Sequence, residues 1–368
     1  MVELLLAALL ATQPAPVEPP VAAPAVATSP QHQVPPAPDQ IMAIPDELRA
    51  LLKARVESRV GPYERRMDRL LALLFEPDGL GIEYAHDATY TVAEAYRTRK
   101  ANCLTFTLLT VALARELGAT AYGQEIDRTL SWNTGGDNIF VQNMHVNAGL
   151  ETGTRRFTID VATNQLLVRT APRRVADARL FSLYYSNRAT ELMLQGRNGE
   201  AEPWLRAALA MDARHATPWN NSGVLAQRQG RTQDAERDFL QALARNRAHT
   251  SALANIVSHY QRHGNRQQAD KWRRHAETMQ RSDPLQQFLL GRDAEQRGDL
   301  HDAARRYQRA IRLDRRQHLF HAALARVWLQ LGEPQRAQEA LLAASRLDAG
   351  AARQGYQAKL DKLRGAAR

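Results

Sequence analysis

The chain of 368 residues has a single cysteine, Cys103, and this scarcity excludes an internal disulfide bond and a zinc site built from thiolates. Long apolar runs are also missing: no stretch reaches the roughly 18 apolar residues that a membrane span needs. The basic and aromatic patterns typical of nucleic-acid binding are absent as well. The sequence therefore predicts no membrane span beyond a possible N-terminal leader, and no metal, cofactor or nucleic-acid partner.

Acidic residues are under-represented in the second half of the chain. From Ser182 onward there are 31 Lys and Arg against 19 Asp and Glu, whereas the preceding part has 18 against 20. The net charge of +10 therefore belongs to the second half. Such a basic surface attracts nucleic acid, anionic lipid or acidic peptides, although an ordinary solvated, arginine-rich helical surface gives the same balance.

The N-terminal residues predict targeting rather than a folded core. Residues 1–12 have the apolar centre and small-residue exit of a secretory signal, but Glu3 stands where a basic segment is usual. Residues 13–44 are rich in Pro and Ala, a composition that behaves as an extended, semi-rigid linker. We therefore expect export to the periplasm or out of the cell. A cytoplasmic location stays open because the leader lacks the basic segment.

The middle of the chain, residues 45–178, changes from helical to strand-like patterns. Thr91 and Glu94 have the spacing of a helix capping box, and Cys103 opens an apolar stretch of helical length that ends at Gly118. Alternating apolar residues then predict strands. Helices followed by antiparallel strands indicate an α+β domain. The expected strands are residues 120–126, 139–147 and 156–161, with a loop at 127–137 and a turn at 148–154.

The order of Cys103, His145 and Asp160 is compatible with nucleophilic catalysis. A helix start and a neighbouring imidazolium both favour the thiolate form of a cysteine, and a carboxylate can orient the imidazole. Each residue alone also has a structural explanation, such as a small buried hydrophobe for the cysteine. Side-chain amides could stabilise an oxyanion, and an aromatic ring could be a site wall or a loop anchor. The candidates for these supporting roles are Asn102 and Gln124 for the amides and Trp132 for the ring.

Three short stretches carry a family resemblance: NCLTF at 102–106, MHV at 144–146 and TIDV at 158–161. They resemble a bacterial branch of the transglutaminase-like superfamily, over roughly residues 60–170. The resemblance implies a papain-like α+β core with a Cys, His, Asp triad. It also implies an enzyme that forms a thioester on its cysteine and transfers the acyl group to water or to an amine.

From Ser182 the sequence repeats every 34 residues without insertion. This period is typical of tetratricopeptide repeats, each of two antiparallel helices, and such repeats are common in the bacterial branch named above. We predict five repeats over residues 182–351, stacked into an all-α superhelix, and a capping helix over 352–368. Glycine recurs at Gly196, Gly230, Gly264, Gly298 and Gly332, and a bulky position is filled by Leu205, Phe239, Arg273, Tyr307 and Leu341, with Arg273 as its one break.

The first helices of such repeats are expected to line a groove that binds a protein or peptide partner. Arginines at these positions favour an acidic or carboxylate-bearing partner, although a solvated surface would look the same. The groove candidates are Asn220, Arg228, Arg262, Arg292 and Arg326.

Two functions follow from these patterns. The first is a cysteine enzyme that acts on amide bonds, as a protease, an amidase or a cross-linking ligase, with repeats that present a protein partner. The second is a non-catalytic scaffold of the cell envelope that binds its partner through the repeats.

Overall fold

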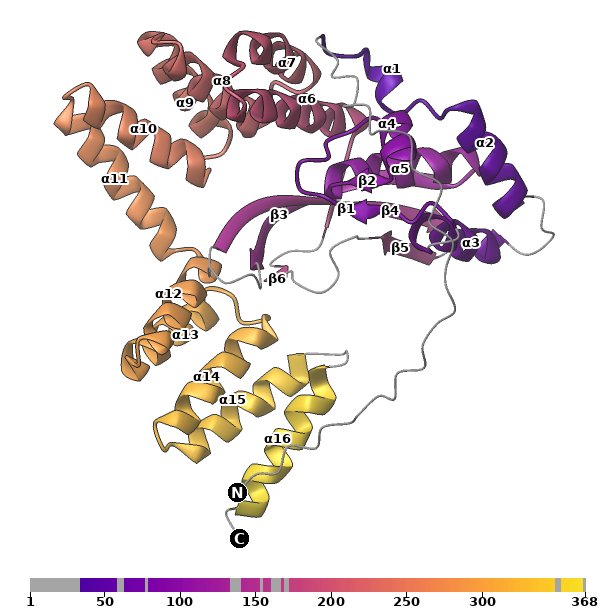
Figure 1. The fold of residues 1–368 in the computed structure, drawn as a ribbon. Coiled ribbons are helices and arrows are strands. Elements are labelled where there is room, and N and C mark those ends of the chain that lie inside the picture. The colour runs from indigo at the N-terminus through magenta and orange to yellow at the C-terminus, as the bar shows by residue number, and fades with distance from the viewer. Residues whose placement is uncertain are drawn as a thin grey trace, which may run out of the picture. The chain divides into compact units, whose positions relative to one another are not determined.

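The computed structural model describes residues 34–57, 63–76, 79–132, 140–152, 155–159, 167–168, 172–347 and 352–366. All of them belong to one compact unit, Val34–Arg368. Helices come first along the chain, then a small sheet, then a long series of helix pairs (Figure 1). The signal-like segment and most of the expected linker lie outside the described residues.

The first helices pack against the apolar core of the N-terminal part. α1 and α2 bury Ile41, Leu48 and Leu52, and the hydroxyl of Tyr185 donates a hydrogen bond of 2.5 Å to the carbonyl of Pro36. The packed chain therefore extends N-terminally of residue 45. These helices are α1 (Pro38–Ile41), α2 (Asp46–Leu52), the π-helical segment η1 (Lys53–Glu57) and α3 (Tyr63–Phe75).

The capping box at Thr91 forms as the sequence predicts. In α4 (Val92–Thr98) the Glu94 amide donates to Thr91 Oγ1 at 3.2 Å, and the Thr91 amide donates to Glu94 Oε2 at 2.8 Å. α5 (Cys103–Glu116) begins at the predicted cysteine. It ends just before Gly118, whose φ of +79° is the left-handed conformation that glycine adopts without strain.

The strands are longer than the sequence suggests. β3 continues through the expected loop to Trp132, and β4 continues through the expected turn to Thr152. Both predictions were wrong because β3 and β4 pair along their whole length, and a change of register between Ile126 and Thr129 absorbs the polar insertion. The strands are β1 (Glu83–Tyr84), β2 (Lys100–Ala101), β3 (Thr120–Trp132), β4 (Phe140–Thr152), β5 (Arg155–Ile159), β6 (Leu167–Val168) and β7 (Arg173–Val175).

The larger sheet is antiparallel, in the order β5-β4-β3-β6, and β7 also pairs with β3. α5 packs on β3 and β4 (Figure 1), and its side chains share an apolar core with Val146, Ala148 and Leu150 of β4. β1 and β2 form a separate parallel pair directly before α5. The part of the chain before the repeats is therefore a mixed helix and sheet region, within which the backbone of Cys103 is fixed by α5.

From Asp177 the chain forms five antiparallel helix pairs, which matches the predicted period (Figure 1). The five periodic glycines all have positive φ, between 72° and 80°. Each follows the first helix of its pair, where a left-handed residue ends the helix. The pairs are α6 (Asp177–Leu194) with α7 (Asn198–Met211), α8 (Ala216–Arg228) with α9 (Thr232–Arg245), α10 (Thr250–Arg262) with α11 (Arg266–Arg281), α12 (Pro284–Gln296) with α13 (Leu300–Leu313), and α14 (His318–Gln330) with α15 (Pro334–Leu347).

Close packing inside each pair explains the small residues of the repeat. A Cβ on Gly223 of α8 would lie 2.6 Å from the ring of Phe239 on α9, and one on Gly291 of α12 would lie 2.6 Å from Tyr307 on α13. Both rings are fully buried. After the last pair, α16 (Ala352–Ala366) packs on α15 and buries Leu360. No helix in the described part of the chain is long and apolar enough to cross a membrane.

A buried ionic cluster joins the sheet to the first repeats. Glu125 of β3 is 2% exposed and accepts a hydrogen bond of 2.6 Å from Arg173, while Arg179 of α6 lies 3.5 Å away. Arg179 also pairs with Asp212 at 2.6 Å, and the ring of His215 lies 3.8 Å from the Glu125 carboxylate. The charges of the two acids and two arginines therefore compensate one another around the buried carboxylate of Glu125, whereas Arg173 reaches solvent.

Candidate functional site

Cys103 is the first residue of α5 and the one partly exposed residue in its first turns. Leu104 to Ala114, which follow it, are all buried. A helix start presents unpaired amide groups and the positive end of the helix dipole, and both favour an anion such as a thiolate. The position of Cys103 is therefore set by the start of the helix, and the residue is partly exposed.

Asn102 has a structural role that sequence reasoning missed. Its Oδ1 accepts a hydrogen bond of 2.9 Å from the amide of Thr105, and its Nδ2 donates to Thr89 Oγ1 at 2.8 Å. The side chain is 5% exposed. Asn102 is thus the N-cap of α5, and this role alone accounts for an asparagine directly before the cysteine.

The sheet brings His145 and Gln124 together. His145 is buried on β4 opposite Ile126, and Gln124 on β3 stands opposite Asn147, so the alternation of the strands places His145 and Gln124 on the same face. Gln124 Oε1 accepts a hydrogen bond of 3.1 Å from the hydroxyl of Thr158 on β5. α5, which starts with the candidate nucleophile, packs on the same strand but shares its core with Val146 and Ala148, which alternate with His145. The histidine therefore lies on the face of β4 that points away from α5.

Two other candidates cannot be placed in this arrangement. Asp160 lies outside the described residues. The backbone of Trp132 ends β3, but its side chain lies outside the described residues. The proposed triad is therefore represented here by its cysteine and its histidine.

Two of the groove candidates contact a neighbouring repeat, and a third contacts its own helix. Asn220 is buried on α8, where its Oδ1 accepts a hydrogen bond of 2.9 Å from Asn255 of the next first helix. Arg228 donates to the carbonyl of Met193 at the end of α6. These contacts connect successive repeats. Arg262 is exposed and donates to Ser258 of its own helix at 3.1 Å.

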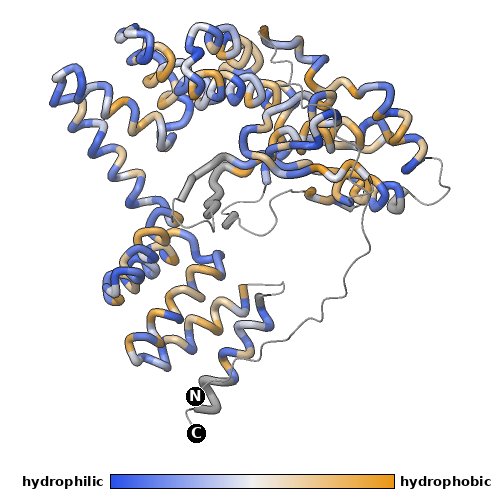
Figure 2. Tube along the Cα trace, in the orientation of Figure 1, coloured by the Kyte–Doolittle hydropathy of each residue, from blue (hydrophilic) through white to orange (hydrophobic). Residues whose placement is uncertain are grey.

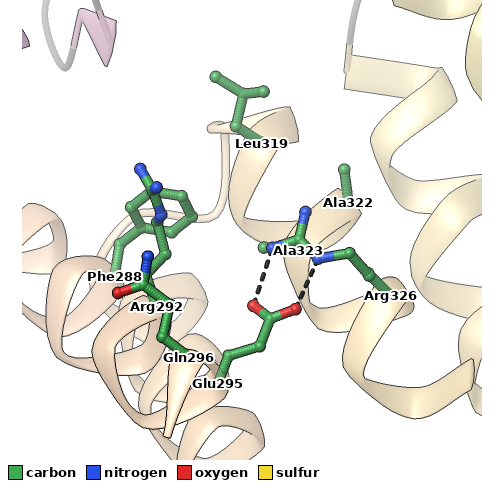
Figure 3. A pocket seen from close by; sticks show the side chains of 8 residues that line it. All are labelled: Phe288, Arg292, Glu295, Gln296, Leu319, Ala322, Ala323 and Arg326. Atoms are coloured by element: carbon green, nitrogen blue, oxygen red, sulfur yellow. Dashed lines mark hydrogen bonds and ion pairs between the residues drawn. The ribbon is translucent and has the colours of Figure 1, made fainter. Parts of the chain in front are cut away.

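The other two candidates, Arg292 and Arg326, line a pocket between α12 and α14 (Figure 3). Its volume is about 440 Å³. Both helices are the first of their pairs, so the pocket lies on the side where the sequence predicts the groove. The remaining lining residues are Phe288, Glu295, Gln296, Leu319, Ala322 and Ala323.

Glu295 holds Arg326 in place at this pocket. The Arg326 guanidinium donates to both Glu295 carboxylate oxygens, at 2.6 and 2.8 Å (Figure 3). The buried Tyr307 hydroxyl also donates to Glu295 Oε2, at 2.7 Å. Burial alone would raise the pKa of Glu295, but the hydrogen bonds from Arg326 and Tyr307 outweigh it and lower that pKa. No sequence signal pointed to Glu295, because its partner lies in the next repeat.

Comparison with known families matches this helical part. The tetratricopeptide repeat family matches residues 186–255 and 288–352. The helix pairs within these residues are tetratricopeptide repeats. Tetratricopeptide repeats bind peptide or protein partners. The matched residues lie within or beyond α6, so the transglutaminase-like resemblance over roughly residues 60–170, and with it the domain expected at 45–178, remains a prediction.

Solved structures are similar to slightly less than half of the chain. MamA from Desulfovibrio magneticus RS-1 is 18% identical, covers 45% of this chain and 94% of its own, and has a TM-score of 0.26. YrrB, described as a TPR protein with an unusual peptide-binding site, is 17% identical, covers 49% of this chain and 92% of its own, and has a TM-score of 0.26. PilF of Pseudomonas aeruginosa is 18% identical, covers 48% of this chain and 81% of its own, and has a TM-score of 0.28. The comparison with curated proteins gave no match.

Proposed function

We propose that this protein is a scaffold whose tetratricopeptide repeats bind a peptide segment of a partner protein. The observation that carries the proposal is the pocket between α12 and α14, on the first-helix side of a tetratricopeptide-repeat array. In this reading the mixed helix and sheet region anchors the array and need not turn over a substrate.

The lining of the pocket supports an apolar side chain as the group that enters. Phe288 and Leu319 stand at its sides, and Ala322 and Ala323 leave space where larger residues would fill it (Figure 3). Arg292 and Arg326 bring two positive charges to the lining and Glu295 brings one negative charge, so the lining has a net positive charge. A segment with an apolar residue next to a carboxylate therefore fits best, because one end is dehydrated and the other meets a cation.

Selection from a displayed peptide library tests the proposal. We expect peptides selected on the wild-type protein to lose most of their binding to Ala322→Trp, in which the indole fills the pocket. The matched control is Ala358→Trp, the same change on the exposed side of α16, and it should bind like the wild type. Arg292→Gln, with a melting temperature close to the wild type, gives a second test that does not depend on a bulky side chain. Selected peptides that bind both tryptophan variants equally would show that the pocket is not the site.

A second function, acyl transfer through Cys103, is supported by the position of this partly exposed cysteine at the start of a buried helix. In this proposal the Cys103 thiolate attacks an amide carbonyl, His145 gives a proton to the leaving amine, and a thioester remains. Asp160 would orient the imidazole. Water or another amine then attacks the thioester and releases the acyl group, and the sulfur leaves as a thiolate.

Mass spectrometry separates the two functions. The protein is incubated with a pool of glutamine-containing peptides, with and without a primary amine. We expect an acyl adduct on Cys103 that disappears in Cys103→Ala and does not accumulate in His145→Gln. If peptide binding to the repeats survives Cys103→Ala and neither adduct nor amide product forms, the protein is a scaffold alone.

Export is a separate part of the proposal, supported by the signal-like composition of residues 1–12. The N-terminus of the protein from its native cells, read by mass spectrometry, tests it. A fragment that begins after residue 12 supports export, and an intact Met1 on cytosolic protein contradicts it.

A further inference from the structure

A second pocket lies between α9 and α11 and has a volume of about 510 Å³. Both are the second helices of their repeats, whereas the pocket of Figure 3 lies between first helices. It is therefore a separate surface from the peptide groove proposed above. The lining residues are Leu240, Leu243, Ala244, Arg247, Lys271, Trp272 and His275.

The charge of this pocket is uncompensated. No acidic residue is among those that line it. Within the described residues, Arg247 and Lys271 form no ion pair, although arginines elsewhere in the array commonly pair on their own helix, as Arg237 does with Asp234 at 2.6 Å. Two solvated cations at one pocket favour a ligand that brings negative charge.

The apolar part of the pocket is formed by an aromatic ring and two leucines. Lys271 Nζ lies 6.0 Å from the ring centroid of Trp272, and the ring of His275 stands edge-on to Trp272 with centroids 5.7 Å apart. His275 Nε2 lies 3.1 Å from the carbonyl oxygen of Arg247, which ties α11 to the end of α9. The half-buried indole is thus held in position and offers a surface for a large apolar side chain.

α11 departs from the repeat pattern at this place. Ala269 is its one buried residue, and Figure 2 colours the helix mostly hydrophilic. Arg273 stands where the other repeats have a bulky apolar residue, and α11 lies in the stretch between the two matched segments, which end at 255 and begin again at 288. α11 therefore contributes fewer buried residues to the core than the other second helices, while Lys271 and Trp272 line a pocket.

We propose that the pocket between α9 and α11 binds an acidic segment of a partner protein, with one bulky apolar side chain against Trp272 and carboxylates beside Arg247 and Lys271. The site does not depend on the groove between α12 and α14, so one array can hold two segments at once. The charge of the pocket selects this occupant over a neutral apolar segment or a further basic one.

Fluorescence anisotropy with labelled peptides tests the site on the full chain. The probes are short peptides in which one Leu, Phe or Trp stands between pairs of Asp or Glu, and the comparison peptides carry Asn and Gln instead. We expect the acidic set to bind more tightly, and the double variant Arg247→Gln/Lys271→Gln to lose about tenfold in affinity, as expected for two partly exposed charge pairs. Trp272→Ala should weaken the acidic and the amide peptides alike, since it removes the apolar contact that both share.

The matched control is Arg266→Gln/Arg274→Gln, which removes the same charge from exposed positions of the same helix outside the pocket. It should change the affinity less than about twofold. An equal loss in both double variants would show unspecific attraction and overturn the proposal. Equal affinities for the acidic and the amide peptides would also overturn the proposal. The same holds if the pocket variants change only self-association or binding to anionic vesicles. Ala322→Trp should leave this binding intact, which separates the site from the first-helix groove.

Discussion

Replacing Glu125 by glutamine tests whether the ionic cluster holds the sheet to the repeats. The change keeps the size of the side chain and removes its charge. Glu125 is 2% exposed, and its carboxylate lies 2.6 Å from Arg173 and 3.5 Å from Arg179. Without that charge, two arginines lose a partner at the junction between β3 and α6.

The size of the effect follows from what each arginine retains. Removal of one partner from a buried ion pair typically costs about 3–5 kcal/mol, because the remaining charge is left without compensation. Here Arg179 keeps its bond of 2.6 Å to Asp212, and Arg173 is 58% exposed, so water can replace the carboxylate. We therefore expect Glu125→Gln to lower the free energy of unfolding by about 2 kcal/mol, below that range.

Urea unfolding followed by tryptophan fluorescence measures this loss. With a slope of about 3 kcal/mol per molar urea, the midpoint should fall by about 0.7 M. The matched control is Glu202→Gln, which removes a carboxylate that is 43% exposed and 3.7 Å from Arg231. It should cost about 0.5 kcal/mol or less. Equal midpoints for the two variants would refute the argument that the buried cluster stabilises the junction.

Three further predictions concern single residues. Burial, followed by the charge of the nearby arginine on α6, lowers the pKa of His215 to about 3, against 6.5 when unfolded. The unfolded chain therefore binds a proton at His215 more readily than the folded chain, so the free energy of unfolding is highest above pH 6.5 and decreases as the pH drops toward 3. We expect a decrease of about 2 kcal/mol between pH 7 and pH 5, and this decrease should be absent in His215→Gln. Urea unfolding at both pH values measures it. Gly223→Ala should cost about 1–3 kcal/mol, because its methyl group would meet the buried phenylalanine ring of α9, whereas Gly199→Ala, with no atom within 4 Å of the new Cβ, should be neutral or stabilising; melting temperatures that fall equally would contradict this. Tyr185→Phe should cost about 1 kcal/mol and expose residues near Pro36 to faster hydrogen exchange, since it removes their buried hydrogen bond; unchanged exchange there would mean that this bond does not anchor the segment.

The predictions that the structure confirmed came from local sequence patterns. The capping box at Thr91, the helix start at Cys103 and the period of the repeats each depend on residues within one turn or one repeat. The expected loop at 127–137 failed because polar residues such as Asp127 predict loops only in the absence of a partner strand. Pairing with β4 keeps residues 127–132 in β3.

The roles of the site residues were harder to predict. Asn102 is compatible with an oxyanion donor by sequence, but its two hydrogen bonds belong to the N-cap and to Thr89. Arg326 was expected as a free groove cation and is bound to Glu295 instead. The N-cap partner of Asn102 is only three residues away, so this role is local and was overlooked, whereas the partner of Arg326 lies 31 residues away along the chain.

The sequence by itself determined the helix pairs of the second half. A glycine every 34 residues ends each first helix in a left-handed conformation, and this requirement is local, so it is visible without any structure. The tertiary structure decided what the charged residues do. It paired Arg326 with Glu295, buried Glu125 between two arginines, and placed Arg247 and Lys271 beside Trp272 without an ion pair to any residue that the structure describes. Electrostatic interactions depend on distance in space, and the repeats bring together charges that the sequence keeps far apart.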